Sequence, residues 1–288
     1  YIPTLVVVGN YGYTFHQTPN LSAIDLRLAN PDVVGTLFQM RDVQDALAPA
    51  ALAAIRARRA PEAPHAAMRN LKRVHDAGIR IAAGTDAGNI GTQHASSFYD
   101  EALTMVESGL SPREVLLTAT RGGAAIMGRE HELGTLERGK LADIVLLKSN
   151  PLKDIRALDS VQHVIKDGHA FPASSILKES PAQIVQRQVN AYNFHDGAIF
   201  AGTYAPNAAI SRNGAALAQS RAAIAQLYGK LFTDNPQLHV EITSREIRGG
   251  QVIDKEHVTG FANGQTLNAT VTYEVIEGMI RGAEILSS

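Results

Sequence analysis

The sequence predicts an α/β segment over residues 1–128, a small β segment over 129–175 and an α+β domain over 176–288. Three observations carry this prediction. In the first part, apolar runs of strand length alternate with segments of helical periodicity. In the second part, short strand-like runs are separated by turn residues. In the third part, helical segments come first and strands with alternating apolar and polar residues follow.

The composition narrows the class of protein. A charged fraction of 19% and a hydrophobic fraction of 45% are typical of a folded protein rather than a disordered one. The formal net charge is −1, so neither nucleic acid nor an anionic membrane is an expected partner. The chain has no cysteine, which excludes disulfides and thiol chemistry but leaves the compartment open. No apolar run approaches the length of a membrane span.

Two strands with a helix between them are predicted first. The run TLVVV at Thr4–Val8 is rich in β-branched residues and ends at a glycine, which is typical of a buried strand. A second strand is predicted at Ile79–Gly84. In the helix that precedes it, Gly78 stands where a left-handed residue ends a helix, and four apolar residues fall at helical spacing: Met68, Leu71, Val74 and Ala77.

Two more helices complete this part. One is predicted from Phe98 to its end at Gly109. The next begins at the stretch SPRE, where Ser111 caps the helix, Pro112 occupies its first turn and Glu114 reaches back to the cap. The order β-α-β-α-α is typical of parallel strands joined by crossover helices.

After residue 128 the predicted elements are small hairpins, followed by helices and then strands. The stretches LGTLERGKLADIVLLKSNPL and VQHVIKDGHAF predict small hairpins with too little apolar content for a core of their own. From residue 176 onwards, Ser180 and Gln183 open an amphipathic helix, and a second helix is predicted over Ser220–Phe232. Strands follow, and one of them alternates so strictly that one sheet face must be buried, through Leu267, Ala269, Val271, Tyr273 and Val275.

The stretch RIAAGTDAGN, residues 80–89, places a single carboxylate, Asp86, at the end of a predicted buried strand. A buried carboxylate costs several kcal/mol unless a cation or hydrogen-bond donors compensate it. Taken alone, GTDAG fits a structural turn or cap as well as it fits a chemical role. A dinucleotide site is a poorer fit, because the glycines at 84, 88 and 91 do not form G-x-G-x-x-G.

Three stretches in this order, AGTDAGN, SGLSPREVLLTATRGGAAIMG and GTLERGKLADIVLLKSNPLKDI, resemble the metal-dependent amidohydrolase superfamily. The likeness is greatest to its imidazolonepropionase-like and prolidase-like members and extends from residue 1 to about 175. It implies part of a distorted (β/α)8 barrel, with Thr4–Val8 as strand 7 and Asp86 at the end of strand 8. It also implies a small β-sandwich segment over 129–175, with a strand at 139–147.

The resemblance also implies a chemistry. Asp86 would ligate a divalent metal, zinc, and act as a catalytic proton shuttle, while a metal-bound hydroxide attacks the carbonyl carbon of a small amide or cyclic amide. In the family, a histidine often precedes a glycine in the loop after strand 8. His94 occupies this place, although Ala95 replaces the glycine. Asn10 and Tyr11, after the predicted strand 7, are further substrate-binding candidates, and plain solvation is the alternative for His94.

The sequence departs from the family in its metal ligands. The His-x-His pair of the first strand, the lysine or glutamate of the fourth and the histidines of the fifth and sixth have no counterpart here. Since Asp86 alone cannot hold zinc, the sequence is expected to be the C-terminal part of a longer hydrolase. This chain alone is then expected to bind no metal and to be inactive. A non-catalytic binding or dimerisation module with a barrel remnant is the alternative.

From about residue 180, the stretches IVQRQVNAYNFHDGAIFAGTYAPNAAI, YGKLFTDNPQLHVEI and GQVIDKEHVTG resemble SnoaL-like members of the nuclear transport factor 2 fold. This resemblance implies a cone-shaped α+β domain with an apolar pocket. The stretch SRNGAAL lacks the carboxylate that ketosteroid-isomerase-like members use as a base, which favours binding or assembly as a homo-oligomer through residues 176–288. The remaining polar candidates for the pocket are His195, Asp196, His239 and Glu256.

Overall fold

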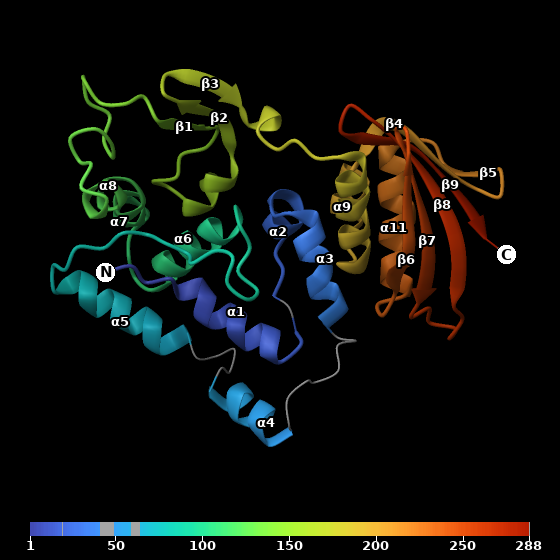
Figure 1. Ribbon diagram of the computed structural model, residues 1–288, viewed down its shortest axis with the longest axis horizontal. Coiled ribbons are helices and arrows are strands. Elements are labelled where there is room, and N and C mark those ends of the chain that lie inside the picture. Colours follow the sequence, from blue (N-terminus) through green and yellow to red (C-terminus); the bar gives the residue numbers. More distant parts are fainter. Residues whose placement is uncertain (19, 41–48, 59–63, 288) are drawn as a thin grey trace. The chain divides into compact units, whose positions relative to one another are not determined.

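The computed structural model describes residues 1–18, 20–40, 49–58 and 64–287 (Figure 1). The chain divides into two compact units. Unit 1 comprises Tyr1–Ala29 and Gln39–Leu177, and unit 2 comprises Asn30–Phe38 and Lys178–Ser288. Among the described helices, none combines the length and the apolar character needed to cross a membrane.

Unit 1 consists of helices and one small sheet. Its helices are α1 (Leu5–Phe15), α2 (Ala23–Leu28), α4 (Pro49–Arg58), α5 (Pro64–Asp76), α6 (Ser97–Glu107), α7 (Pro112–Leu117) and α8 (Gly123–Ile126), with a π-helical turn at Thr118–Gly122 between the last two. An antiparallel sheet of order β1-β2-β3 follows, made of β1 (Ile144–Leu147), β2 (Val161–Lys166) and β3 (His169–Pro172). The main core of the unit contains Leu5, Leu71, Ile81, Met105 and Val115.

Several local predictions for unit 1 are confirmed. The helix predicted before Gly78 is α5, and Gly78 has the expected positive φ of 71°. The capping box of α7 is present, because Ser111 Oγ accepts a hydrogen bond from Glu114 N at 3.3 Å and the Glu114 carboxylate accepts one from Ser111 N at 2.7 Å. The predicted hairpin of β2 and β3 turns at Asp167 and Gly168, which both have positive φ.

The strand predicted at Thr4–Val8 is wrong, because Leu5 begins helix α1. The physical reason is that a side chain distant in the sequence caps the N-terminus of this helix. Glu101 of α6 accepts hydrogen bonds from Leu5 N at 3.0 Å and from Val6 N at 2.9 Å. Thr4, the N-cap residue, has φ of 44° and makes no side-chain cap of its own. Tertiary capping therefore overrides the β propensity of the run.

The strand predicted at Ile79–Gly84 is also absent as a regular element. One step of parallel pairing is present, since Tyr1 N donates to Arg80 O at 2.9 Å and Ala82 N donates to Tyr1 O at 3.1 Å. The partner of this segment is thus Tyr1 rather than the predicted Thr4–Val8. A strand is stabilised by pairing along its length, and a single step of pairing leaves the rest irregular.

Unit 2 is a six-stranded sheet with helices against it. The sheet order is β5-β4-β9-β8-β7-β6, and only the β4–β9 pair is parallel. Its strands are β4 (Tyr204–Arg212), β5 (Ala215–Ala218), β6 (His239–Arg248), β7 (Gln251–Thr259), β8 (Leu267–Ile276) and β9 (Met279–Ser287). Its helices are α3 (Pro31–Gln39), α9 (Pro181–Asn193), α10 (Gly197–Gly202) and α11 (Arg221–Asp234), of which α9 and α11 cover one face of the sheet (Figure 1).

The predicted elements of unit 2 are confirmed where the local signals are strong. Ser180 and Gln183 form the expected capping box at the start of α9. In β8 the residues Ala269, Val271, Tyr273 and Val275 are buried and alternate with more exposed polar residues. The sheet therefore has one face in the core, as the alternation predicts.

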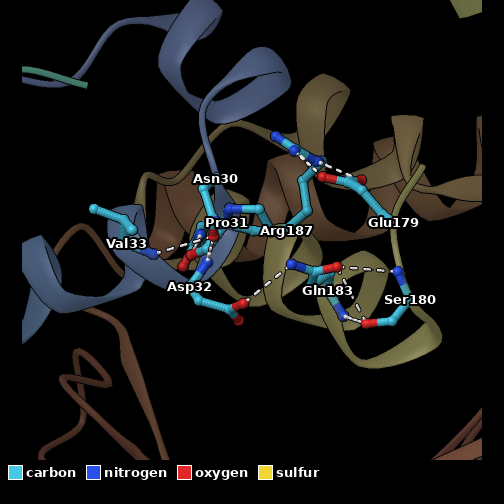
Figure 2. A network of polar contacts seen from close by, with 9 residues as sticks. Asn30, Pro31, Asp32, Val33, Glu179, Ser180, Gln183 and Arg187 are labelled. Carbon is cyan, nitrogen blue, oxygen red and sulfur yellow. Dashed lines mark hydrogen bonds and ion pairs between the residues drawn. The ribbon is translucent and has the colours of Figure 1, made fainter. Parts of the chain in front are cut away.

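Helix α3 packs on α9 although some 150 residues separate them in the chain. Asn190 donates from Nδ2 to Pro31 O at 2.7 Å. In the contact between labelled residues in Figure 2, Gln183 donates from Nε2 to Asp32 Oδ2 at 3.2 Å. A Cβ atom at Gly35 would lie 2.8 Å from Gln186 Nε2, so glycine permits this close approach. The face of α9 that turns away from the sheet thus has a partner.

Glu101→Gln is expected to loosen the start of α1. A glutamine has only one side-chain oxygen to accept from the two backbone N–H groups. Its amide N–H donors would face the second backbone N–H, and the lost hydrogen bond costs about 2 kcal/mol of stability. Hydrogen-exchange mass spectrometry of a peptide covering residues 1–15 should show faster exchange. Glu107→Gln, at an exposed position on the same helix, is the control and should leave this peptide unchanged. Equal exchange in both variants would contradict the capping role.

Candidate functional site

Asp86 lies on the surface and not in the buried environment that the sequence suggested. Its φ of 50° places the backbone in the left-handed region, in a tight turn closed by Asn89 N donating to Asp86 O at 3.2 Å. Asn89 also donates from its side chain, Nδ2, to Asp86 Oδ2 at 2.8 Å. The other carboxylate oxygen, Oδ1, has no hydrogen-bond partner among the described residues.

This bonding pattern distinguishes Asp86 from a capping residue. An aspartate that caps a helix or closes an Asx turn accepts hydrogen bonds from backbone N–H groups. Within the described chain, the carboxylate of Asp86 accepts only from the side chain of Asn89. The carboxylate is held in one direction and keeps one oxygen available.

Helix α1 brings two further predicted residues to the same loop. The Tyr11 hydroxyl donates a hydrogen bond to Asn89 Oδ1, so Asn89 links Tyr11 to Asp86. Asn10 donates from Nδ2 to Thr92 Oγ1 at 3.3 Å. The structure therefore brings Asp86, Tyr11 and Asn10 together, although the last two are on a helix and do not follow a strand.

His94 lies over the same turn. A Cβ atom at Gly88 would be 3.1 Å from His94 Nε2, so the imidazole is adjacent to the backbone two residues after Asp86. His94 is exposed. The next residue, Ala95, has φ of 71°, a conformation that glycine adopts more easily than alanine.

Sequence analysis missed a pair of carboxylates near this loop. Asp25 and Asp100 line a cavity of about 490 Å³ that Asn10 also lines. Asp25 is 4% exposed and accepts hydrogen bonds from Ser22 and Ser96. Burial, and then the neighbouring Asp25, raise the pKa of Asp100 to about 7. The motif SAID, a capping box over Ser22–Asp25, was the available signal for one of the two.

The residues around Asp86 do not by themselves make up a zinc site. In the part of the chain that the structure describes, no three histidine, aspartate or glutamate side chains are grouped to hold a metal ion. Structural and catalytic zinc ions take three or four protein ligands. Asp86 can supply one oxygen to such a site.

All four pocket candidates in unit 2 have contacts within the fold, and one of them also lines a cavity. Asp196 caps α10 by accepting from Ala198 N and Ile199 N, both at 2.9 Å. The His195 ring bonds to Leu238 O, and His239 is 8% exposed. Glu256 lines a small cavity between the sheet and the helices.

Comparison with known proteins identifies both parts. Residues 35–171 match the amidohydrolase family, and residues 185–283 match the SnoaL-like domain. The chain therefore combines part of an amidohydrolase domain with a SnoaL-like domain, as its resemblances imply.

Curated relatives match the first part. An imidazolonepropionase of Streptomyces avermitilis is 38% identical over 104 residues, which are 36% of this chain and 25% of that protein. One of Parabacteroides distasonis is 32% identical over 103 residues, 35% of this chain and 25% of that protein. The chain thus spans about a quarter of the length of these relatives.

Solved structures match each part. A Xaa-Pro dipeptidase with bound methionine in its active site is 30% identical, with a TM-score of 0.38, over 50% of this chain and 34% of that one. An uncharacterised cystatin-fold protein of Novosphingobium aromaticivorans is 19% identical, with a TM-score of 0.36, over 38% of this chain and 98% of that one.

Asp100→Asn is expected to reduce the pH dependence of stability. The pKa of Asp100 rises from 3.8 to about 7 on folding, so its ionisation lowers the free energy of unfolding as pH increases through this interval. Above pH 7 the loss is complete, and below pH 3.8 it is absent. Thermal unfolding at pH 5 and pH 8 should show a smaller decrease in Tm for Asp100→Asn than for the unmodified chain. The exposed control Glu107→Gln should match the unmodified chain, and an equal decrease in all three would refute the assignment.

Proposed function

We propose that this chain is the C-terminal part of a hydrolase that cleaves an amide-like C–N bond in a small molecule. Asp86 is the proposed catalytic carboxylate: it accepts a proton from the attacking water and returns it to the leaving nitrogen. In the complete enzyme, Asp86 is also the proposed ligand of a divalent metal, zinc, whose other ligands come from residues outside this sequence. The metal would supply Lewis-acid activation of the water.

The observation that supports this proposal most is the state of the Asp86 carboxylate. Asn89 holds Oδ2, Tyr11 holds Asn89, and Oδ1 remains available at the surface. A proton-accepting group must be oriented and also accessible, and both conditions are met here. The proposed substrate contacts are His94, beside the turn, and Asn10 and Tyr11 on α1.

The substrate class comes from the relatives. The names of the matched proteins, imidazolonepropionase among them, indicate hydrolysis of C–N bonds in cyclic or amide-like molecules. We therefore propose a small amide or cyclic amide as the substrate. The described surface around Asp86 also bears a neutral amide, Asn10, and a phenol, Tyr11, which suit an uncharged polar substrate.

Asp86→Asn in the complete protein should lower kcat/KM more than about a hundredfold, the lower range of general acid–base catalysis. Asparagine has nearly the same size but cannot accept the proton and is a weaker metal ligand. Steady-state kinetics on a cyclic amide, with elemental analysis of zinc, is the measurement. Glu137→Gln, an exposed carboxylate elsewhere in unit 1, is the control. Activity within a few-fold of normal and unchanged zinc content would make Asp86 a structural residue.

The expectation that this chain alone binds no metal can be measured separately. The 288-residue chain alone should retain well under one zinc per chain after dialysis, because Asp86 belongs to no group of three candidate ligands among the described residues. Tightly held stoichiometric zinc would mean that the ligands lie elsewhere in this sequence.

For unit 2 we propose assembly into a homo-oligomer through the outer face of its sheet. In β8 this face carries Asn268, Thr270, Thr272 and Glu274, of which the two threonines are partly buried. Polar residues with little charge suit a hydrogen-bonded interface between two copies. Twofold pairing of identical faces is the commonest arrangement in soluble oligomers.

Thr272→Lys in the full chain should weaken self-association, because a twofold interface would bring two added charges together. Light scattering at micromolar concentration should show an oligomer for the unmodified chain and a shift towards monomer for the variant. Thr233→Lys, exposed on α11, is the matched control. A monomeric unmodified chain would contradict assembly. Residues 176–288 alone are also expected to fold and self-associate, although they lack the α3 helix that packs on α9.

A further inference from the structure

Unit 2 contains a small cavity of about 30 Å³ that is partly open, and Glu256 in its wall is half-buried. This volume is close to that of one water molecule in the liquid, so the cavity suits one small polar group. Apolar residues from the sheet and from α9 form part of its wall. The polar residues that line it are Gln188, Tyr192, Tyr204, Tyr228, Glu256 and Tyr273.

Glu256 is the acid of this cavity. It pairs in register with Ala269, and it lies between Asp254 and Val258 on the inward face of β7. The Tyr273 hydroxyl donates to Glu256 Oε1 at 2.8 Å, while Oε2 has no hydrogen-bond partner among the described residues. Burial raises the pKa of Glu256 to about 7. Its neighbour Asp254 is already paired, since Arg245 donates to both of its oxygens at 2.7 Å.

Two tyrosine hydroxyls of the lining are also without partners. Tyr228 is 8% exposed, and neither its hydroxyl nor that of Tyr192 bonds to another group among the described residues. Tyr204, by contrast, accepts from Gln188 Nε2 at 3.2 Å. Tyr228 and Glu256 line the same cavity, and burial, and then the charge of Glu256, raise the pKa of Tyr228.

The charged side chain that lines the cavity is an acid. When ionised, Glu256 gives the cavity a negative charge, and the residues that line it include no lysine, arginine or histidine. This lining therefore favours a cation over an anion, while Arg245 acts on Glu256 and Arg212 on Tyr228 from outside the lining. Three oxygen atoms are available as acceptors: Glu256 Oε2 and the hydroxyl oxygens of Tyr192 and Tyr228.

We propose that this cavity binds a primary ammonium group, as the ammonium ion or methylammonium. Either cation has a positive charge to neutralise Glu256, and methylammonium has three N–H donors and ammonium four for the three oxygens. Ammonium is about as large as water and fits the observed volume, and the methyl group of methylammonium would extend through the open side of the cavity. The site is separate from Asp86 and does not rest on the proposed hydrolase activity.

Thermal unfolding of the full chain at pH 8, where Glu256 is ionised, tests the proposal. Ammonium chloride and methylammonium chloride should raise the Tm of unit 2 in a saturable way. Potassium chloride and tetramethylammonium chloride at the same ionic strength are the controls, because neither cation has an N–H donor. Equal effects of potassium and ammonium would overturn the proposal.

Substitutions of the lining residues test whether ammonium binds in this cavity. Glu256→Gln should weaken ammonium binding about tenfold or more, because a hydrogen bond to a charged group is lost. Tyr228→Phe keeps the ring and removes one acceptor, so it should weaken binding less. Glu241→Gln, exposed on β6, should bind like the unmodified chain.

Direct observation of bound ammonium on the unmodified chain tests the proposal even if a variant does not fold. With ¹⁵N-labelled ammonium, the unmodified chain should show N–H protons that exchange slowly with water. Absence of such signals at saturating ammonium, or unchanged affinity in a folded Glu256→Gln chain, would show that the cavity holds only water.

Discussion

The carboxylate of Glu101 is the constraint on which the geometry of unit 1 depends. It is fully buried, and burial raises its pKa to about 7 against the opposing effect of two backbone hydrogen bonds. Those bonds come from Leu5 and Val6, so one side chain of α6 satisfies two of the donors that open a helix. The negative charge also lies at the positive end of the α1 dipole.

This cap determines where the candidate site forms. Because α1 begins at Leu5, Tyr11 lies six residues along the helix, about 9 Å from its start at 1.5 Å per residue. At that point its hydroxyl meets Asn89, which in turn holds Asp86. Had Thr4–Val8 been a strand, the same residues would lie further along an extended chain. The cap and the site are therefore parts of one arrangement.

Local signals in the sequence predict much of the fold, whereas long-range contacts are beyond them. The capping boxes at Ser111 and Ser180 depend on residues three positions apart, and both are present. Whether Thr4–Val8 forms a strand or a helix depends on Glu101, and the packing of α3 depends on Asn190. Neither contact leaves a pattern in the intervening sequence.

The same distinction applies to the sites. The motif GTDAGN led to Asp86, but it did not reveal that Asn89, the last residue of the motif, orients the carboxylate. Alternation along β7 could have placed Glu256 on the inward face with Asp254, since both lie an even number of residues from buried Val252 and Val258. The coupling of Asp100 to Asp25 requires the tertiary fold.

Burial alone does not separate a structural acid from a functional one; the partners of each oxygen do. Glu101 and Glu256 both have a pKa raised to about 7 by burial. In Glu101 each oxygen accepts a backbone N–H, so both oxygens are used within the fold. In Glu256 one oxygen accepts from Tyr273 and the other has no hydrogen-bond partner among the described residues. Asp86 has the same half-occupied pattern at the surface, and for this reason these two carboxylates, rather than the most buried one, carry the proposed chemistry of the chain.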